Sequence, residues 1–85
     1  MIHFDVVQAE VIGDLTFEVT FADGTSGKVK ILPSHLYGVF APLSDPEVFV
    51  QLYIEEGAVC WPGDIDLAPD AMHEAIRANG VMILS

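Results

Sequence analysis

The chain has 85 residues, of which 52% are apolar, and it carries thirteen Asp and Glu against three Lys and Arg, a formal net charge of −10. A chain of this length supports one hydrophobic core but not two, so we expect a single domain over residues 1–85. It cannot bury all of its apolar side chains, and we expect the surplus to be covered in a homo-oligomer.

The charge balance restricts the partners that this chain can bind. Nucleic-acid binding depends on clusters of Lys and Arg that neutralise phosphates, and the chain offers only Lys28, Lys30 and Arg77. We therefore expect no direct nucleic-acid binding and no attachment to an anionic membrane. The same negative field favours a basic protein partner.

The sequence also bears on localisation. Met1–Glu10 lacks the basic start and the long apolar run of a secretory signal. The longest stretch without Asp, Glu, Lys or Arg, Ile31–Ser44, contains two prolines and is too short to cross a bilayer. Cys60 is the only cysteine, so no internal disulfide can form. These features predict a cytoplasmic protein.

The first half of the chain has the pattern of antiparallel strands. Apolar and polar residues alternate from Leu15 to Phe21, a period of two that predicts a strand with one apolar face. Asp23-Gly24 predicts a tight turn, and the alternation over Lys28–Ile31 completes a hairpin. Before it, the apolar residues at positions 2–11 change parity. That change predicts a bulge or a strand covered on both faces, with Gly13-Asp14 as the next turn.

A connector follows, because Pro33 cannot donate to a ladder in the middle of a sheet and so ends the third strand. The connector, His35–Leu43, is uncharged and rich in large apolar side chains. Two interpretations are open: it docks a protein partner, or it forms a lid over the core. The residues that we expect to form the partner-binding patch are Leu36, Tyr37, Val39 and Phe40.

The middle of the chain predicts a short helix and a second hairpin. Ser44-Asp45-Pro46-Glu47 has the form of a capping box with proline in the first turn, which predicts a helix to about Val50. Leu52–Glu55 and Ala58–Trp61 predict two strands around a turn at Glu56-Gly57.

The last third predicts a helix and an apolar tail. Pro69 is typical of a helix start, and Asn79-Gly80 is a stop signal. The tail is either an added edge strand or an exposed apolar end that promotes association. We expect it to form the oligomer edge through Val81, Met82, Ile83 and Leu84. The pattern as a whole predicts the α+β class, with an antiparallel meander sheet of about five strands, a short middle helix and a C-terminal helix.

No residue has the context of a catalytic or cofactor-binding group. Cys60 lies in a predicted strand of an acidic chain, which favours a buried, inert thiol over a reactive one. Trp61 precedes Pro62, and we expect its ring to cap the core rather than to form an interface. His3, His35 and His73 lack the close spacing of a zinc site. The chain contains no Gly-x-Ser-x-Gly elbow and no phosphate-binding glycine loop.

Asp64, Asp66 and Asp70 form the most metal-like cluster of the sequence. A calcium loop that began at Asp64 would need glycine at its sixth position, where this chain has Pro69. Structural roles in the loop and at the helix start are therefore favoured, and cation binding stays open as the alternative. We assign no metal ligands and no cofactor.

Three motifs are similar to those of a known family. They are Phe21-x-Asp23-Gly24, Phe40-Ala41-Pro42-Leu43-x-Asp45-Pro46-x-x-Phe49 and Trp61-Pro62-x-x-x-Asp66-Leu67-Ala68-Pro69-Asp70. With them the chain resembles a family of bacterial domains of unknown function, number 2442, from the second strand to the last helix. One departure is Gly63-Asp64, where the family has Asn-Gly.

The resemblance implies an α+β fold with an antiparallel sheet. It also implies an antitoxin-like or regulatory accessory role, because some relatives are fused to a helix-turn-helix or encoded beside small toxin-like proteins. It supplies no catalytic residues.

Three hypotheses about function follow. The first is a non-catalytic interaction module that binds a basic protein partner. The second is a small-molecule sensor or small enzyme with a pocket between sheet and helix, which would be supported by a concavity lined by Trp61 and convergent acids. The third is a structural scaffold, which the sequence does not separate from the first.

Overall fold

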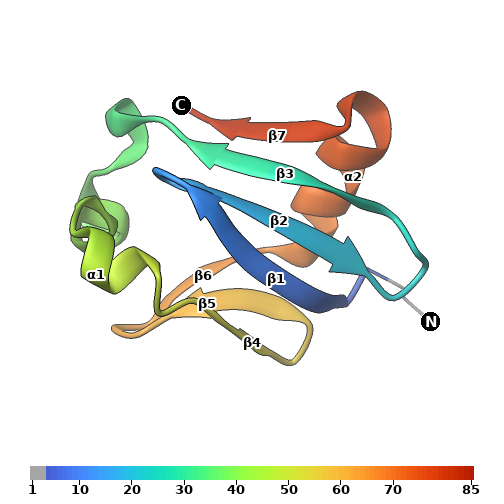
Figure 1. Cartoon of the computed structure of the whole chain (residues 1–85), viewed down its shortest axis with the longest axis horizontal. Coiled ribbons are helices and arrows are strands. Elements are labelled where there is room, and N and C mark those ends of the chain that lie inside the picture. The colour runs from blue at the N-terminus through green and yellow to red at the C-terminus, as the bar shows by residue number, and fades with distance from the viewer. Residues whose placement is uncertain (1–3) are drawn as a thin grey trace.

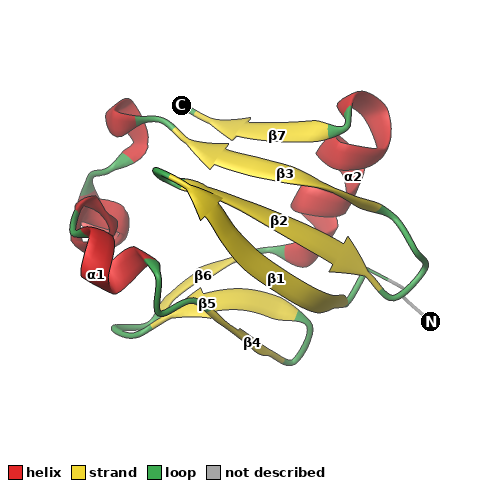
Figure 2. Ribbon diagram, viewed as in Figure 1, coloured by secondary structure: helices red, strands yellow, loops and turns green. Residues whose placement is uncertain are grey.

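Seven strands in the described part of the chain form two sheets, and helical segments connect them (Figures 1 and 2). The computed structural model describes residues 4–85, so the predictions that involve Ile2 and His3 lie outside the described residues. The elements in chain order are β1 (Val6–Gly13), β2 (Thr16–Phe21), β3 (Ser26–Ile31), the 3-10 helices η1 (Pro33–His35) and η2 (Gly38–Ser44), α1 (Pro46–Phe49), β4 (Tyr53–Glu55), β5 (Ala58–Trp61), β6 (Ile65–Leu67), α2 (Pro69–Asn79) and β7 (Val81–Leu84).

The larger sheet has the strand order β1-β2-β3-β7. Its first three strands are antiparallel neighbours, as the alternation of their sequence predicted. The register shift between Val6 and Gln8 coincides with the change of parity and corresponds to a bulge, and a second shift lies between Val11 and Gly13. β7 then pairs with β3 in parallel, with Lys28 beside Val81 and Ile31 beside Leu84.

The α+β class is confirmed, but the prediction of one antiparallel meander of about five strands is wrong. β4, β5 and β6 form a separate antiparallel sheet, because the connector carries the chain away from the edge of β3 before the second hairpin begins. β6 was not predicted, because its three residues are too few to show an alternating pattern. β7 is parallel to β3 because α2 returns the chain to the end of the sheet from which β3 starts.

The helices begin and end close to the predicted residues. In α1 the cap is Asp45, whose Oδ1 accepts the Glu47 N–H at 2.9 Å, so the N-cap lies one residue after the Ser44 of the expected capping box. α2 starts with Pro69 and ends at Gly80, which has a φ of 77°. Gly80 donates its N–H to the Ile76 carbonyl at 2.6 Å, the left-handed cap that the Asn-Gly pair predicted.

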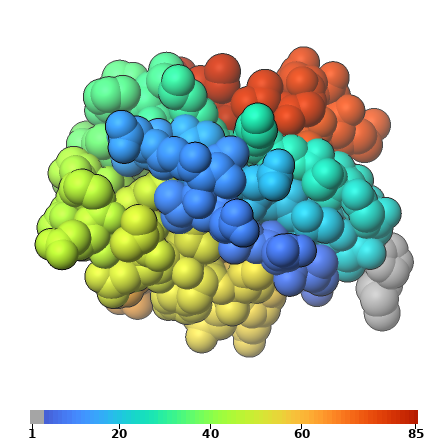
Figure 3. All heavy atoms as spheres, in the orientation of Figure 1, coloured from blue at the N-terminus to red at the C-terminus, as the bar shows by residue number. Residues whose placement is uncertain are grey.

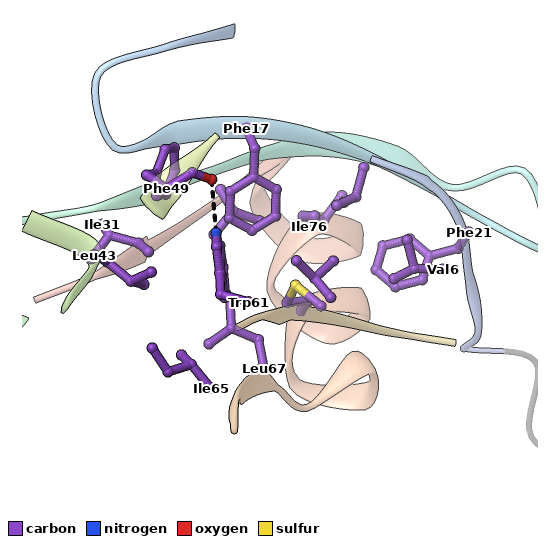
Figure 4. Packing of buried hydrophobic residues seen from close by; sticks show 14 residues of the cluster. Val6, Phe17, Phe21, Ile31, Leu43, Phe49, Trp61, Ile65, Leu67 and Ile76 are labelled. Atoms are coloured by element: carbon purple, nitrogen blue, oxygen red, sulfur yellow. Dashed lines mark hydrogen bonds between the residues drawn. The ribbon is translucent and has the colours of Figure 1, made fainter. Parts of the chain in front are cut away.

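The core lies between the two sheets and α2, and Trp61 is at its centre (Figure 4). The indole ring is fully buried, and its N–H donates to the Phe49 carbonyl at 2.9 Å. The Phe17 and Phe49 rings lie 5.7 and 5.8 Å from it, the first edge-on and the second stacked. A single aromatic cluster therefore joins β2, α1 and β5.

A second contact joins α2 to the β2–β3 turn. His73 is 6% exposed and lies between the rings of Phe4 and Phe21, with centroid distances of 4.6 and 5.0 Å. Its Nε2 is 2.7 Å from Oδ2 of Asp23. Oδ1 of the same carboxylate accepts the Thr25 N–H at 2.9 Å, so Asp23 closes the turn and also holds the helix.

Gly27 allows α2 to lie close to β3, and this generates a stability prediction. A Cβ built at Gly27 would lie 2.5 Å from Cγ2 of Ile76 and 2.7 Å from the Gly80 carbonyl oxygen. We expect Gly27→Ala to lower the free energy of unfolding by about 1–3 kcal/mol, because backbone has to move. Urea unfolding followed by tryptophan fluorescence measures the change.

Gly13→Ala is the matched control, since a Cβ at Gly13 meets no atom within 4 Å. Equal unfolding free energies for the two variants would show that the close approach of α2 carries no energetic constraint.

The Asp23 carboxylate predicts an acid-sensitive contribution to stability. The Thr25 N–H, and next the His73 ring, hold the pKa of Asp23 at about 2, below its ordinary value of 3.8. Because the pKa of Asp23 is lower in the folded protein than in the unfolded chain, its carboxylate stabilises the fold when the pH is above the pKa of the unfolded chain. This contribution is lost as the pH falls from about 4 to about 2. We expect Asp23→Asn to melt at a lower temperature than the parent at pH 6, with the difference shrinking over that range.

Asp14→Asn, in the exposed β1–β2 turn, controls for the removal of one negative charge. A melting-temperature difference for Asp23→Asn that stayed constant from pH 6 to pH 2 would contradict this account.

Candidate functional site

The connector between β3 and α1 divides its apolar residues between core and solvent. Leu36 and Phe40 are half-buried and pack against the core. Tyr37 and Val39 are 68% and 65% exposed, the two most exposed large apolar side chains of the described residues. Of the four residues predicted to form a docking patch, two therefore anchor the connector and two face solvent.

Leu32 and His35, the latter the first residue of the connector, meet the end of β7, so the two regions singled out from the sequence lie side by side. The Leu32 N–H donates to the Leu84 carbonyl at 2.8 Å, and Nδ1 of His35 is 3.4 Å from the Ser85 carbonyl oxygen. The His35 ring also packs on Tyr37 and Phe40, with centroids 5.9 and 4.9 Å away. In Figure 1 the end of β7 and the connector occupy the same corner of the molecule.

The charges are unevenly distributed over the two sheets. Lys28 and Lys30 are exposed on β3, and Arg77 is exposed on the neighbouring α2. The part of the molecule formed by α1 and the small sheet contains no Lys or Arg and exposes the carboxylates Asp45, Glu47, Glu55, Glu56, Asp64 and Asp66. In Figure 3 this part of the chain lies at the left and bottom of the molecule, away from β7 and α2 at the top.

A shallow depression lies on the outer face of the small sheet. Tyr53, Cys60 and Asp66 stand in one row across β4, β5 and β6. With Glu55, Asp64 and Ile65 they line a volume of about 170 Å³. Burial, and then the charge of Asp66 and Glu55, raises the pKa of the Cys60 thiol, while burial and then Glu55 raises that of Tyr53. The protonated thiol is the state of an inert cysteine.

The metal-like cluster of the sequence is split by the fold. Asp64 and Asp66 line the depression, but Asp70 lies at the start of α2 and does not. Among the described residues, no three His, Cys, Asp or Glu side chains converge as a metal site would require. His35 and His73 belong to separate contacts, with Ser85 and Asp23.

A larger cavity of about 280 Å³ lies at the opposite end of the core from His73. The β1–β2 turn, η2 and α1 form its walls. It does not include Trp61, whose ring was expected to cap the core and is instead fully buried at its centre. The lining residues are Gly13, Asp14, Leu15, Leu43, Ser44, Pro46 and Phe49.

Sequence reasoning missed the pairing of His73 with Asp23. The two residues are 50 positions apart, and no local pattern links them. The available signal was helical spacing: His73 lies three residues before the apolar Ile76, so the two side chains share the buried face of α2.

The burial of Cys60 predicts slow chemistry at this thiol. Cys60 is 7% exposed and has a raised pKa, so little thiolate is accessible at pH 7.5. We expect a thiol reagent to label the native protein more slowly than the urea-unfolded chain by a factor on the order of a hundred. Labelling can be followed by mass spectrometry.

A Tyr37→Cys variant supplies an exposed thiol in the same folded chain as an internal reference. If Cys60 reacted in the native protein as fast as this reference thiol, the inert assignment would be wrong.

None of the helices within residues 4–85 has the length and apolar character needed to cross a membrane. Searches of curated proteins and of solved structures returned no match. A family model does match residues 6–78, which is most of the chain and includes all three motifs identified in the sequence. The chain therefore belongs to the family described as protein of unknown function (DUF2442).

Proposed function

We propose that this domain is a non-catalytic protein-interaction module with an antitoxin-like or regulatory accessory role, which binds and restrains a basic protein partner. The observation that carries the proposal is the pair of exposed side chains Tyr37 and Val39, beside a part of the molecule that carries only negative charge. In this proposal the protein is located in the cytoplasm, which its single cysteine, unable to form an internal disulfide, favours.

Apolar and charged parts of the surface have separate tasks in this proposal. Tyr37 offers a large, rigid contact area with a hydroxyl group, a combination enriched at the energetic centres of interfaces. Leu36 and Phe40 hold the connector on the core, so little ordering entropy is lost on binding. The exposure of Tyr37 and Val39 favours a docking role for the connector, in addition to the covering of the core by Leu36 and Phe40.

Charge supplies the selectivity. η2, which contains Val39, is followed directly by α1 with Asp45 and Glu47, both exposed. A partner that contacts Tyr37 and Val39 therefore meets carboxylates at once, and Lys or Arg side chains on that partner complement them. The net charge of −10 steers such a partner over longer distances and opposes nucleic acid and anionic membranes.

Self-association is a second part of the proposal. Val81–Leu84 forms an outer strand of the larger sheet and contains four apolar residues without a charge. We propose that this strand is the edge through which the chain forms a homo-oligomer.

The alternative is a small-molecule sensor or a small enzyme. The cavity between the β1–β2 turn and α1 favours it, because Leu43 and Phe49 give an apolar floor and Asp14 and Ser44 are the polar groups of its lining. Its volume of about 280 Å³ lies at the lower limit of the usual range for ligand pockets.

Affinity capture with a matched pair of variants tests the proposal. The tagged protein is expressed in its native cells, and eluates at low and high salt are analysed by quantitative mass spectrometry. We expect a basic protein to be recovered at low salt in an amount nearly equal to that of the tagged protein, and to be lost at high salt. Its recovery should fall about tenfold or more in the variant Tyr37→Ser/Val39→Ser, because hot-spot truncations cost upwards of 1–2 kcal/mol.

Val7→Ser is the control, since Val7 is 59% exposed on β1 and belongs to neither region. Unchanged recovery by the double variant, together with a lower melting temperature, would assign the connector to the lid role alone. Recovery of the domain by itself would favour the alternative, which a thermal-shift screen of small molecules then tests.

A further inference from the structure

We infer that β7 pairs with β7 of a second copy, antiparallel and across a two-fold axis at Met82, to join two four-stranded sheets into one. This inference rests on the self-association proposed above and specifies its geometry. Figure 1 shows β7 at the rim of the sheet, with β3 on its inner side.

The free hydrogen-bonding groups of β7 can be identified from its contacts with β3. The Gly80 carbonyl accepts the Lys28 N–H at 3.4 Å, and the Leu84 carbonyl accepts the Leu32 N–H at 2.8 Å. Because strand residues alternate in the side to which their N–H and C=O groups point, Gly80, Met82 and Leu84 face β3. Val81 and Ile83 therefore direct their N–H and C=O groups away from the sheet.

β7 is also the outer strand without protection against pairing. The outer strands of the two sheets in the described chain are β1, β4, β6 and β7. β1 contains Glu10 and two register shifts, β4 contains Glu55, and β6 contains Asp66, features that oppose the addition of another strand. β7 has neither a charge nor a bulge, and Ile83 is 56% exposed on it.

The free groups of β7 are complementary to themselves. In an antiparallel pair with Met82 opposite Met82, Val81 of one copy faces Ile83 of the other, and each such pair exchanges two N–H···O=C bonds. A two-fold axis then satisfies all of these groups in both copies and closes the assembly as a dimer.

The side chains around β7 favour a second copy over a basic segment of another protein. Lys28 and Lys30 lie beside Val81 and Ile83 on the same exposed face. They would repel a cationic strand at this edge, whereas a second copy adds Val81 and Ile83 to an apolar strip between the lysine stems. Across that strip the lysines of the two copies are three strand spacings apart, about 14 Å, and salt screens them from one another.

Analytical ultracentrifugation over a concentration series tests this edge. A pairing of four-residue strands buries less than the ~1,200 Å² of a stable interface, so we expect half-dimerisation between about 10 µM and about 1 mM. The Ile83→Lys variant should sediment with the mass of a single chain at every concentration of the series. Val7→Lys is the matched control, because Val7 and Ile83 are 59% and 56% exposed on outer strands of the same sheet, and it should dimerise as the parent does.

Cross-linking tests the register. A Met82→Cys variant places two thiols opposite each other at the two-fold axis, where Cα atoms of a non-hydrogen-bonded pair lie about 4.5 Å apart, within disulfide range. We expect mild oxidation to give a disulfide-linked dimer at least about tenfold faster than with Ile12→Cys, an exposed position on β1.

Salt distinguishes this dimer from the proposed partner complex. Two chains of charge −10 repel each other, so dimerisation should strengthen with salt while the basic partner is lost. A parent protein that stays monomeric to about 1 mM, an Ile83→Lys variant that dimerises as the parent does, or equal cross-linking rates at 82 and 12 would each overturn the inference. None of these outcomes affects capture of a basic partner by the Tyr37 and Val39 surface.

Discussion

The hydrogen bond from the Trp61 indole to the Phe49 carbonyl is the constraint on which the rest of this fold depends. It is fully buried, and it joins the small sheet to the end of α1 at 2.9 Å. The Phe17 ring of the larger sheet packs edge-on against the same indole. A buried donor left without an acceptor costs about 1–3 kcal/mol, so α1 must stay where its last carbonyl meets Trp61.

This fixed position of α1 determines the path of the connector. The chain leaves β3 at Ile31 and has to reach Asp45, the cap of α1, across one end of the core. Leu36, Phe40 and Leu43 hold it there, with Leu43 fully buried. On this path the chain turns through η1 and η2, and Tyr37 and Val39 lie on the outside. Their exposure is thus built into the route of the chain, and an apolar residue at either position contributes little to the core.

The sequence predicted those parts of the fold that depend on local chemistry. The β2–β3 hairpin follows from alternation and from Asp23-Gly24, and both ends of α2 follow from Pro69 and Gly80. The arrangement of strands into two sheets did not follow, because the parallel pairing of β3 with β7 joins residues more than 50 positions apart. No pattern within either strand encodes that contact. The family model spans residues 6–78 and so covers the hairpin turn and the caps of both helices, the parts that the sequence specifies most directly.

The candidate surfaces were predictable to a similar extent. Hydrophobicity alone singled out the connector and Val81–Leu84, but it did not separate Leu36 and Phe40 from Tyr37 and Val39. That separation depends on which side of a 3-10 turn meets the core, and the core was not known from the sequence.

The distribution of charge explains how one acidic chain can offer two different surfaces. Two copies that approach each other repel through a net charge of −10 each, and the repulsion is weakest where the local charge is least negative. All three cations of the chain lie on β3 and α2, the two elements that flank β7, whereas α1 and the small sheet expose carboxylates alone. An edge strand without charge, flanked by these cations, is therefore accessible to a second copy, and the carboxylates of α1 and the small sheet lie away from that strand and stay free for a partner of opposite sign. Placing Lys28 and Lys30 on β3 lowers the electrostatic cost of self-association without reducing the attraction that the rest of the surface exerts on a basic protein.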